Sequence, residues 1–80
     1  SEERRQDLNR FVHKLIEDGR ISVRNIRRDA LHQIHDYGKE EHVSEDEIKR
    51  NEQEVQDLTD KRIKKLNDMQ NEKEKELLET

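Results

Sequence analysis

The sequence predicts an all-α fold, an antiparallel hairpin of two long helices, and three observations support this prediction. The 80 residues include no Pro and only two Gly, so few positions interrupt a helix. Apolar residues recur at helical spacing in both halves of the chain. One interruption, at Gly38, divides the chain into two segments of similar length. The low hydrophobic fraction of 26% and the charged fraction of 48% also occur in disordered chains, but the periodicity favours folded helices.

The first predicted helix covers residues 1–37. Ser1 is placed to cap it, and acidic residues follow where the helix dipole favours them. Gly19 lies inside the apolar stripe of this helix and predicts a close approach by another backbone. The stripe is spaced by three or four residues and therefore lies on one face, and its members are Leu8, Val12, Leu15, Gly19, Val23, Ile26, Ala30, Ile34 and Tyr37, widened by Phe11, Ile16, Ile21 and Leu31.

A turn is predicted at residues 38–43, because Gly38 can take the left-handed conformation that ends helices. The second predicted helix, 44–79, begins with a capping box of Ser44 and Glu47, which a hydrophobic staple accompanies. The short connection makes the two helices antiparallel neighbours. The second apolar stripe is thinner than the first, and its members are Ile48, Val55, Leu58, Ile63, Leu66, Met69, Leu77 and Leu78.

We call the line of contact between the two helices the seam. The two apolar stripes are wider than this seam requires, so we expect a third helix to cover them. This helix would come from a missing part of the chain, from a second copy or from a partner. The chain lacks an initiator Met, and we expect it to be a piece of a longer protein. It has no Cys to form a disulfide. Its longest apolar run is two residues, so we expect no membrane-spanning segment.

Charge is distributed unevenly along the chain, in spite of a net charge of −4. Residues 1–37 are nearly balanced, whereas residues 38–80 carry nine basic and fourteen acidic residues. The first helix contains four arginines at positions i, i+4, i+7 and i+8, which share one face, and they are Arg20, Arg24, Arg27 and Arg28.

We expect these four arginines to lie off the apolar stripe and to point to solvent or to a ligand. We call these four arginines the arginine ridge. The guanidinium group suits phosphate geometry, so the ridge predicts RNA binding. The alternative is an ordinary solvated or ion-paired surface, in which Arg20 pairs with Glu17.

The sequence predicts a binding protein without a cofactor rather than an enzyme. His32, His35 and Asp36 lie within about one helical turn, but a metal site needs three or four convergent ligands, and solvated histidines are the favoured interpretation. Neither Ser22 nor Thr59 has a base at a recognisable spacing. No glycine-rich phosphate loop is present, and a pair of helices offers no pocket that excludes water.

Four segments of the sequence, taken in order, resemble the ribosome recycling factor family across nearly all 80 residues. Residues 23–30, VRNIRRDA, closely resemble the family signature VRNxRRDA. Residues 2–8, EERRQDL, resemble the start of the last two helices of that family. Residues 43–46, VSED, stand where the family has ISED, and residues 56–65, QDLTDKRIKK, resemble QxLTDxxIKK.

The resemblance implies that the chain forms two helices of a three-helix bundle, the stem of an L-shaped protein. The first helix and a second, mostly β domain would precede Ser1. It further implies a non-enzymatic factor in the cytoplasm of bacteria, or in the stroma or matrix of an organelle. Such a factor binds between the ribosomal subunits after termination, along large-subunit ribosomal RNA. With the translocation GTPase EF-G, reached through the missing second domain, it splits the ribosome for reuse.

The family's RNA-contacting arginines fall on Arg24, Arg27 and Arg28 of this chain, and an arginine near the start of the matching region falls on Arg5. Arg20 shares the helical face of the first three. The alternative function is structural: a helical hairpin that self-associates into a four-helix bundle and has no RNA role. Self-association would also cover the apolar groove.

Overall fold

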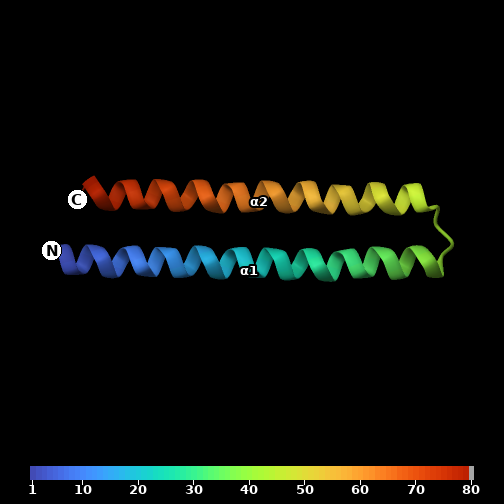
Figure 1. The fold of residues 1–80 in the computed structure, drawn as a ribbon, viewed down its shortest axis with the longest axis horizontal. Coiled ribbons are helices and arrows are strands. Elements are labelled where there is room, and N and C mark those ends of the chain that lie inside the picture. Colours follow the sequence, from blue (N-terminus) through green and yellow to red (C-terminus); the bar gives the residue numbers. More distant parts are fainter. Residues whose placement is uncertain (80) are drawn as a thin grey trace.

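A computed structural model describes residues 1–79 of the chain as two helices, α1 (Glu2–Glu40) and α2 (Glu45–Glu79). The helices run antiparallel, and both ends of the chain lie at the same end of the molecule (Figure 1). The predicted all-α hairpin is therefore confirmed, and the described residues contain no strand. Neither described helix has the apolar length that crossing a membrane requires.

The hairpin is a rod rather than a globule. Its Cα atoms extend over 61 × 15 × 9 Å, and their radius of gyration is 18.2 Å. A compact domain of this length would have a radius of gyration of about 12 Å. The two helices therefore have a single seam in which to bury side chains.

Both helices begin with the predicted serine caps. Ser1 Oγ accepts a hydrogen bond from the backbone N–H of Arg4 at 3.3 Å, and Ser44 Oγ accepts one from the backbone N–H of Glu47 at 3.2 Å. Each cap satisfies a backbone donor that has no partner inside the helix. The local sequence therefore fixes both helix starts.

The prediction that Gly38 ends the first helix is wrong. α1 continues to Glu40, three residues beyond the predicted end, and the residue with positive φ is His42, at 55°. Gly38 is buried inside the helix, where an added Cβ would lie 2.5 Å from Ile48 Cδ1. Glycine is needed here for the close approach of α2 at the turn, not for a left-handed backbone.

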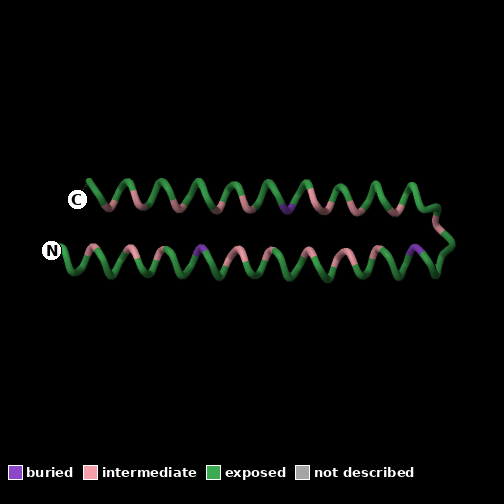
Figure 2. The backbone as a smooth tube through the Cα atoms, in the orientation of Figure 1, coloured by how far each residue is buried: buried purple, intermediate pink, exposed green. Residues whose placement is uncertain are grey.

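The seam is narrow and contains few fully sequestered groups. Besides Gly38, the buried residues among 1–79 are Ile16 and Thr59, at 7% and 8% exposure, and Thr59 Oγ1 donates to the carbonyl of Val55 at 2.8 Å. Figure 2 shows that the half-buried parts of each helix face the other helix, while the outward sides are exposed. The half-buried apolar residues are Val12, Val23, Ala30, Leu31, Ile34, Val43, Ile48, Val55, Ile63, Leu66 and Leu77.

The predicted stripe of α1 divides into two rows. One row packs in the seam, and Gly19 lies in it, where an added Cβ would meet the side chain of Leu66 at 3.4 Å rather than the predicted backbone. The other row stays in water, and its members have exposed fractions between 41% and 68%. These exposed residues are Leu8, Phe11, Leu15, Ile26 and Tyr37, and Leu58, Met69 and Leu78 of α2 are exposed as well. Ile21, which was predicted to widen the stripe, is 47% exposed.

The two glycines predict stability changes of opposite sign. Gly19→Ala adds a methyl group at ordinary contact distance, so the higher helix propensity of Ala should raise the free energy of unfolding by up to about 1 kcal/mol. Gly38→Ala would force Ile48 to move. This overpacking should lower the free energy of unfolding by about 1 kcal/mol, although Ala has the higher helix propensity. Urea unfolding followed by circular dichroism measures both changes. An equal stabilisation by the two substitutions would contradict the tight contact at Gly38.

Candidate nucleic-acid interface

The seam divides the surface of the hairpin into two long faces of different chemistry. On the apolar face, a groove of about 220 Å³ lies between the helices, lined mainly by Val23, Ile26, Ala30, Val55 and Leu58. On the polar face, a groove of about 300 Å³ is lined by polar and charged residues, among them Arg24, Arg27, Gln56, Asp60, Lys64 and Asn67. Arg27 and Thr59 border both grooves, because they occupy the seam between them.

The four predicted arginines divide into two pairs. Arg24 and Arg28 are exposed, as predicted. The prediction that all four point to solvent is wrong for Arg20 and Arg27, which are only partly exposed and turn toward α2. The reason is geometric: the seam lies closer to this ridge than the predicted stripe suggested, so the two arginines that are seven residues apart fall on its edge.

Arg20 is clamped across the seam. Its Nε donates to Asn67 Oδ1 at 3.0 Å, its Nη1 to Glu17 at 3.0 Å, and its Nη2 to Gln70 Oε1. Its side chain is 18% exposed. The pairing with Glu17, which the alternative interpretation of this surface predicted, is therefore present, and Arg20 acts as a cross-link between the helices.

Arg27 is held more loosely. Its Nη1 donates to Gln56 Oε1 at 3.3 Å, and Gln56 Nε2 in turn donates to Asp60 Oδ1 at 2.9 Å. Its Nε is buried and has no hydrogen-bond partner. The guanidinium group of Arg27 therefore has one neutral contact to α2 and no carboxylate in direct contact among residues 1–79.

Arg24 has the most freedom of the predicted set. It makes no hydrogen bond or ion pair with any residue in the described range 1–79. Arg28 is 60% exposed, and its Nε lies 3.6 Å from Asp29 Oδ1, which is a weak, solvated pair. Arg5 is instead half-buried and ion-paired with Glu2. Among the five predicted arginines, Arg24 and Arg28 are thus the ones whose donors are most available to a ligand.

The sequence-based interpretation assigned no role to His13, yet His13 also joins the two helices. Its Nε2 lies 2.6 Å from Glu74 Oε1, and its Nδ1 lies 2.8 Å from Nε2 of Gln70, the residue that also accepts from Arg20. The signal was present in the spacing: His13, Arg20 and Arg27 follow each other at seven-residue intervals on α1. The matching row on α2 is Asp60, Asn67 and Glu74.

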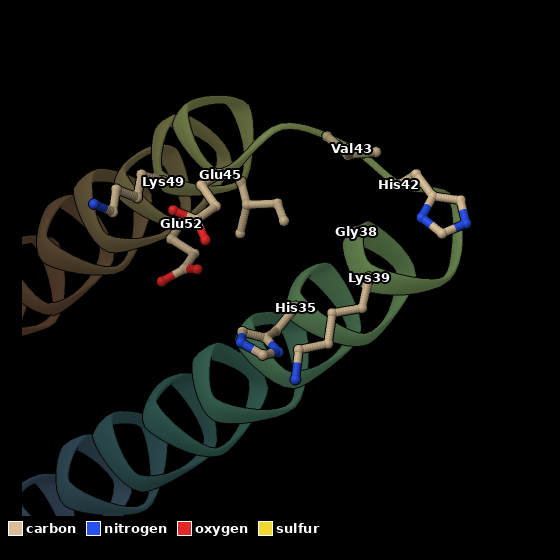
Figure 3. Close-up of a pocket in the computed structure, with 9 residues that line it drawn as sticks. His35, Gly38, Lys39, His42, Val43, Glu45, Lys49 and Glu52 are labelled. Atoms are coloured by element: carbon tan, nitrogen blue, oxygen red, sulfur yellow. The ribbon is translucent and has the colours of Figure 1, made fainter.

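The histidines near the turn do not form a metal site. A wide groove at this end contains His35 and Lys39 from α1 and Glu45, Lys49 and Glu52 from α2 (Figure 3). Within residues 1–79, no three His, Asp or Glu side chains, His32, His35 and Asp36 included, converge as a metal ion would require. The mixed charges of this groove select no particular ligand.

The chain is similar to proteins of one family. The family model described as ribosome recycling factor matches residues 1–78. Curated relatives named ribosome-recycling factor include those of Symbiobacterium thermophilum, 51% identical over 79 residues, Thermus thermophilus, 49% over 78, and Xylella fastidiosa, 45% over 78. These matches cover 98–99% of this chain but 42–43% of the relatives. The chain therefore spans less than half the length of the relatives it matches.

The different settings of Arg20 and Arg24 predict different effects on stability. Arg20→Ala removes three hydrogen bonds across or beside the seam and should lower the free energy of unfolding by about 1–3 kcal/mol. Arg24→Ala removes no contact and should change it by less than about 0.5 kcal/mol. Urea unfolding of the two variants tests this contrast, and equal effects would show that Arg20 is not a cross-link.

Proposed function

The chain belongs to the ribosome recycling factor family, and from this membership we propose that it binds large-subunit ribosomal RNA with the polar face of its hairpin. The observation that carries the proposal is the exposure of Arg24 and Arg28 on one side of α1, with Arg24 unpaired within residues 1–79. Guanidinium groups that have no strong protein partner can form charge-assisted hydrogen bonds to phosphate without first losing an ion pair.

The five arginines predicted from the sequence then have unequal roles. Arg24 and Arg28 contact the phosphate backbone, and Arg27 contributes from the edge of the seam. Arg20 is already engaged by Asn67, Glu17 and Gln70, so we assign it to holding the hairpin together. The ion pair with Glu2 likewise makes Arg5 a weaker candidate for RNA contact.

The apolar face supports a second part of the proposal, that the hairpin is incomplete without another helix. The described chain exposes 6661 Å², whereas a compact monomer of 9.8 kDa exposes about 5,200 Å². A row of exposed apolar side chains lies beside the apolar groove and contributes to this surface. We propose that the full-length protein supplies a first helix that covers this face and completes a three-helix bundle.

Splitting of the ribosome would belong to the full-length protein. There we propose that the second domain, with EF-G, acts on the post-termination ribosome between its subunits, while the stem anchors the factor to RNA. The protein would work where such ribosomes are found, in the bacterial cytoplasm or in the stroma or matrix of an organelle. We propose that the contribution of the hairpin itself is binding.

The alternative function, a structural hairpin that self-associates into a four-helix bundle, is favoured by the same exposed apolar row. Two copies that pack these faces together would bury the excess surface. This alternative predicts a melting temperature that rises with chain concentration, and ribosome binding that does not depend on the arginines of the polar face. Sedimentation and melting measured over a range of concentrations distinguish the two functions.

The proposed RNA contact predicts a loss of salt-dependent binding. The double variant Arg24→Ala, Arg28→Ala should bind purified large ribosomal subunits more weakly. The negative slope of log K against log salt should become shallower by about 2 units, one for each lost phosphate contact. Binding is measured by co-sedimentation at several salt concentrations.

A matched control removes two charges elsewhere. Lys61 and Lys65 are exposed and lie three and seven residues after Leu58, on the side of α2 that bears the apolar face. Lys61→Ala with Lys65→Ala should leave most of the affinity and the salt slope in place. If both double variants lose affinity equally, the attraction is diffuse and the polar face is not the RNA site.

A further inference from the structure

Two arginines of α1 reach α2 through the same arrangement of side chains. Arg20 donates to the Oε1 atom of Gln70, and Arg27 donates to the Oε1 atom of Gln56. In each case the glutamine Nε2 donates to a carboxylate four residues further along α2, at 3.2 Å for Glu74 and 2.9 Å for Asp60. We call each arrangement of arginine, glutamine and carboxylate a relay.

The relay of Arg27 differs from that of Arg20 in one important respect. Arg20 has two further partners, Asn67 and Glu17, so its orientation is fixed without Gln70. For Arg27, the contact to Gln56 is the one side-chain hydrogen bond made within residues 1–79, and its Nε is buried without an acceptor. The direction of the Arg27 guanidinium therefore depends on Gln56.

The chemistry of the relay fixes the direction of the Gln56 amide. A guanidinium group can only donate hydrogen bonds, and an ionised carboxylate can only accept them. The amide must therefore turn its oxygen toward Arg27 and its NH₂ toward Asp60. If Asp60 were absent, the amide could rotate and present its NH₂ to the guanidinium, which would repel it.

The neutral amide also keeps the positive charge of Arg27 available. A carboxylate in the place of Gln56 would form a direct ion pair with the guanidinium and compete with a phosphate ligand. The amide instead holds the guanidinium beside the polar groove, which Arg24 and Lys64 also line. The relay thus orients a cation without neutralising it.

We infer that Gln56 is a positioning residue for RNA binding: it aims Arg27 into the polar groove as a third phosphate contact, and Asp60 holds Gln56 in the orientation that makes this possible. The ligand class is the phosphodiester backbone of RNA. This inference rests on the proposed function, and it assigns to two residues of α2 a role in an interface that the sequence placed on α1 alone.

A neighbouring pair on α2 provides matched controls. Gln53 Nε2 donates to Asp57 Oδ1 at 2.9 Å, which repeats the glutamine–carboxylate pair of the relay at the same spacing. No arginine donates to Gln53 among the described residues. Substitutions at Gln53 and Asp57 therefore reproduce the charge changes at Gln56 and Asp60 without disturbing an arginine.

The experiment compares four single variants in binding to purified large ribosomal subunits over a range of salt concentrations. Gln56→Glu and Gln53→Glu each add one negative charge, whereas Asp60→Ala and Asp57→Ala each remove one. Charge alone predicts that both additions weaken binding and both removals strengthen it. Positioning predicts that Gln56→Glu and Asp60→Ala both weaken binding, although their charge changes have opposite signs.

For Gln56→Glu, the expected result is a loss of affinity of roughly eightfold at about 0.1 M salt. The slope of log K against log salt should become shallower by about 1, since one phosphate contact contributes about 0.9 to its magnitude. Asp60→Ala should bind several-fold more weakly than Asp57→Ala. Circular dichroism should show the same helicity in all four variants, so that unfolding does not explain the losses.

Two outcomes would overturn the inference while leaving the proposed function intact: tighter binding by Asp60→Ala that matches Asp57→Ala, or equal affinities of Gln56→Glu and Gln53→Glu. If the parent chain does not bind large subunits at all, the proposed function fails and the positioning role fails with it.

Discussion

A pair of helices can bury only one strip of each helix, and this limit shapes the rest of the molecule. The strip holds Ile16 and Thr59 as its buried side chains, and none of the large side chains in residues 1–79 is fully enclosed. Apolar burial alone is small in such a seam, so hydrogen bonds between the helices carry a larger share of the stability than they do in a globular core. The clamp of Arg20 on Asn67 and Gln70 is the clearest case.

The same limit separates the two faces of the rod. Side chains that do not fit in the seam must lie on one side of it or on the other, and the apolar row gathers on the side opposite to Arg24 and Arg28. The face that we propose for another helix and the face that we propose for RNA are therefore separate surfaces of a rod only two helices thick. Arg20, at the seam, holds the hairpin together, whereas Arg24 and Arg28 lie further from α2 and remain exposed.

Features that depend on local sequence could be predicted. The helices, their serine caps and the antiparallel pairing follow from periodicity, capping chemistry and a short connection. The role of Gly38 could not be predicted, because a left-handed helix end and a close helix contact both favour glycine. Only the position of Ile48 decides between them.

The candidate site was predictable to a similar degree. Helical spacing gave the relative directions of the arginines, and it correctly left Arg24 and Arg28 on the surface. It did not give the direction of α2, so it could not show that Arg20 and Arg27 face Asn67 and Gln56. The partners of an arginine on another helix are a tertiary property, and no spacing within α1 contains them.

The two repeat lengths on α1 have a geometric consequence for Arg27. The polar row at His13, Arg20 and Arg27 repeats every seven residues, whereas the apolar row at Leu15, Ile26 and Tyr37 repeats every eleven. On a straight helix these rows drift by about 20° per repeat in opposite directions, so the angle between them narrows along α1 from the N-terminus toward the turn. Arg27, the last member of the polar row, borders both grooves. If another helix docks on the apolar face and RNA docks on the polar face, as proposed above, Arg27 and Thr59 lie between the two bound surfaces.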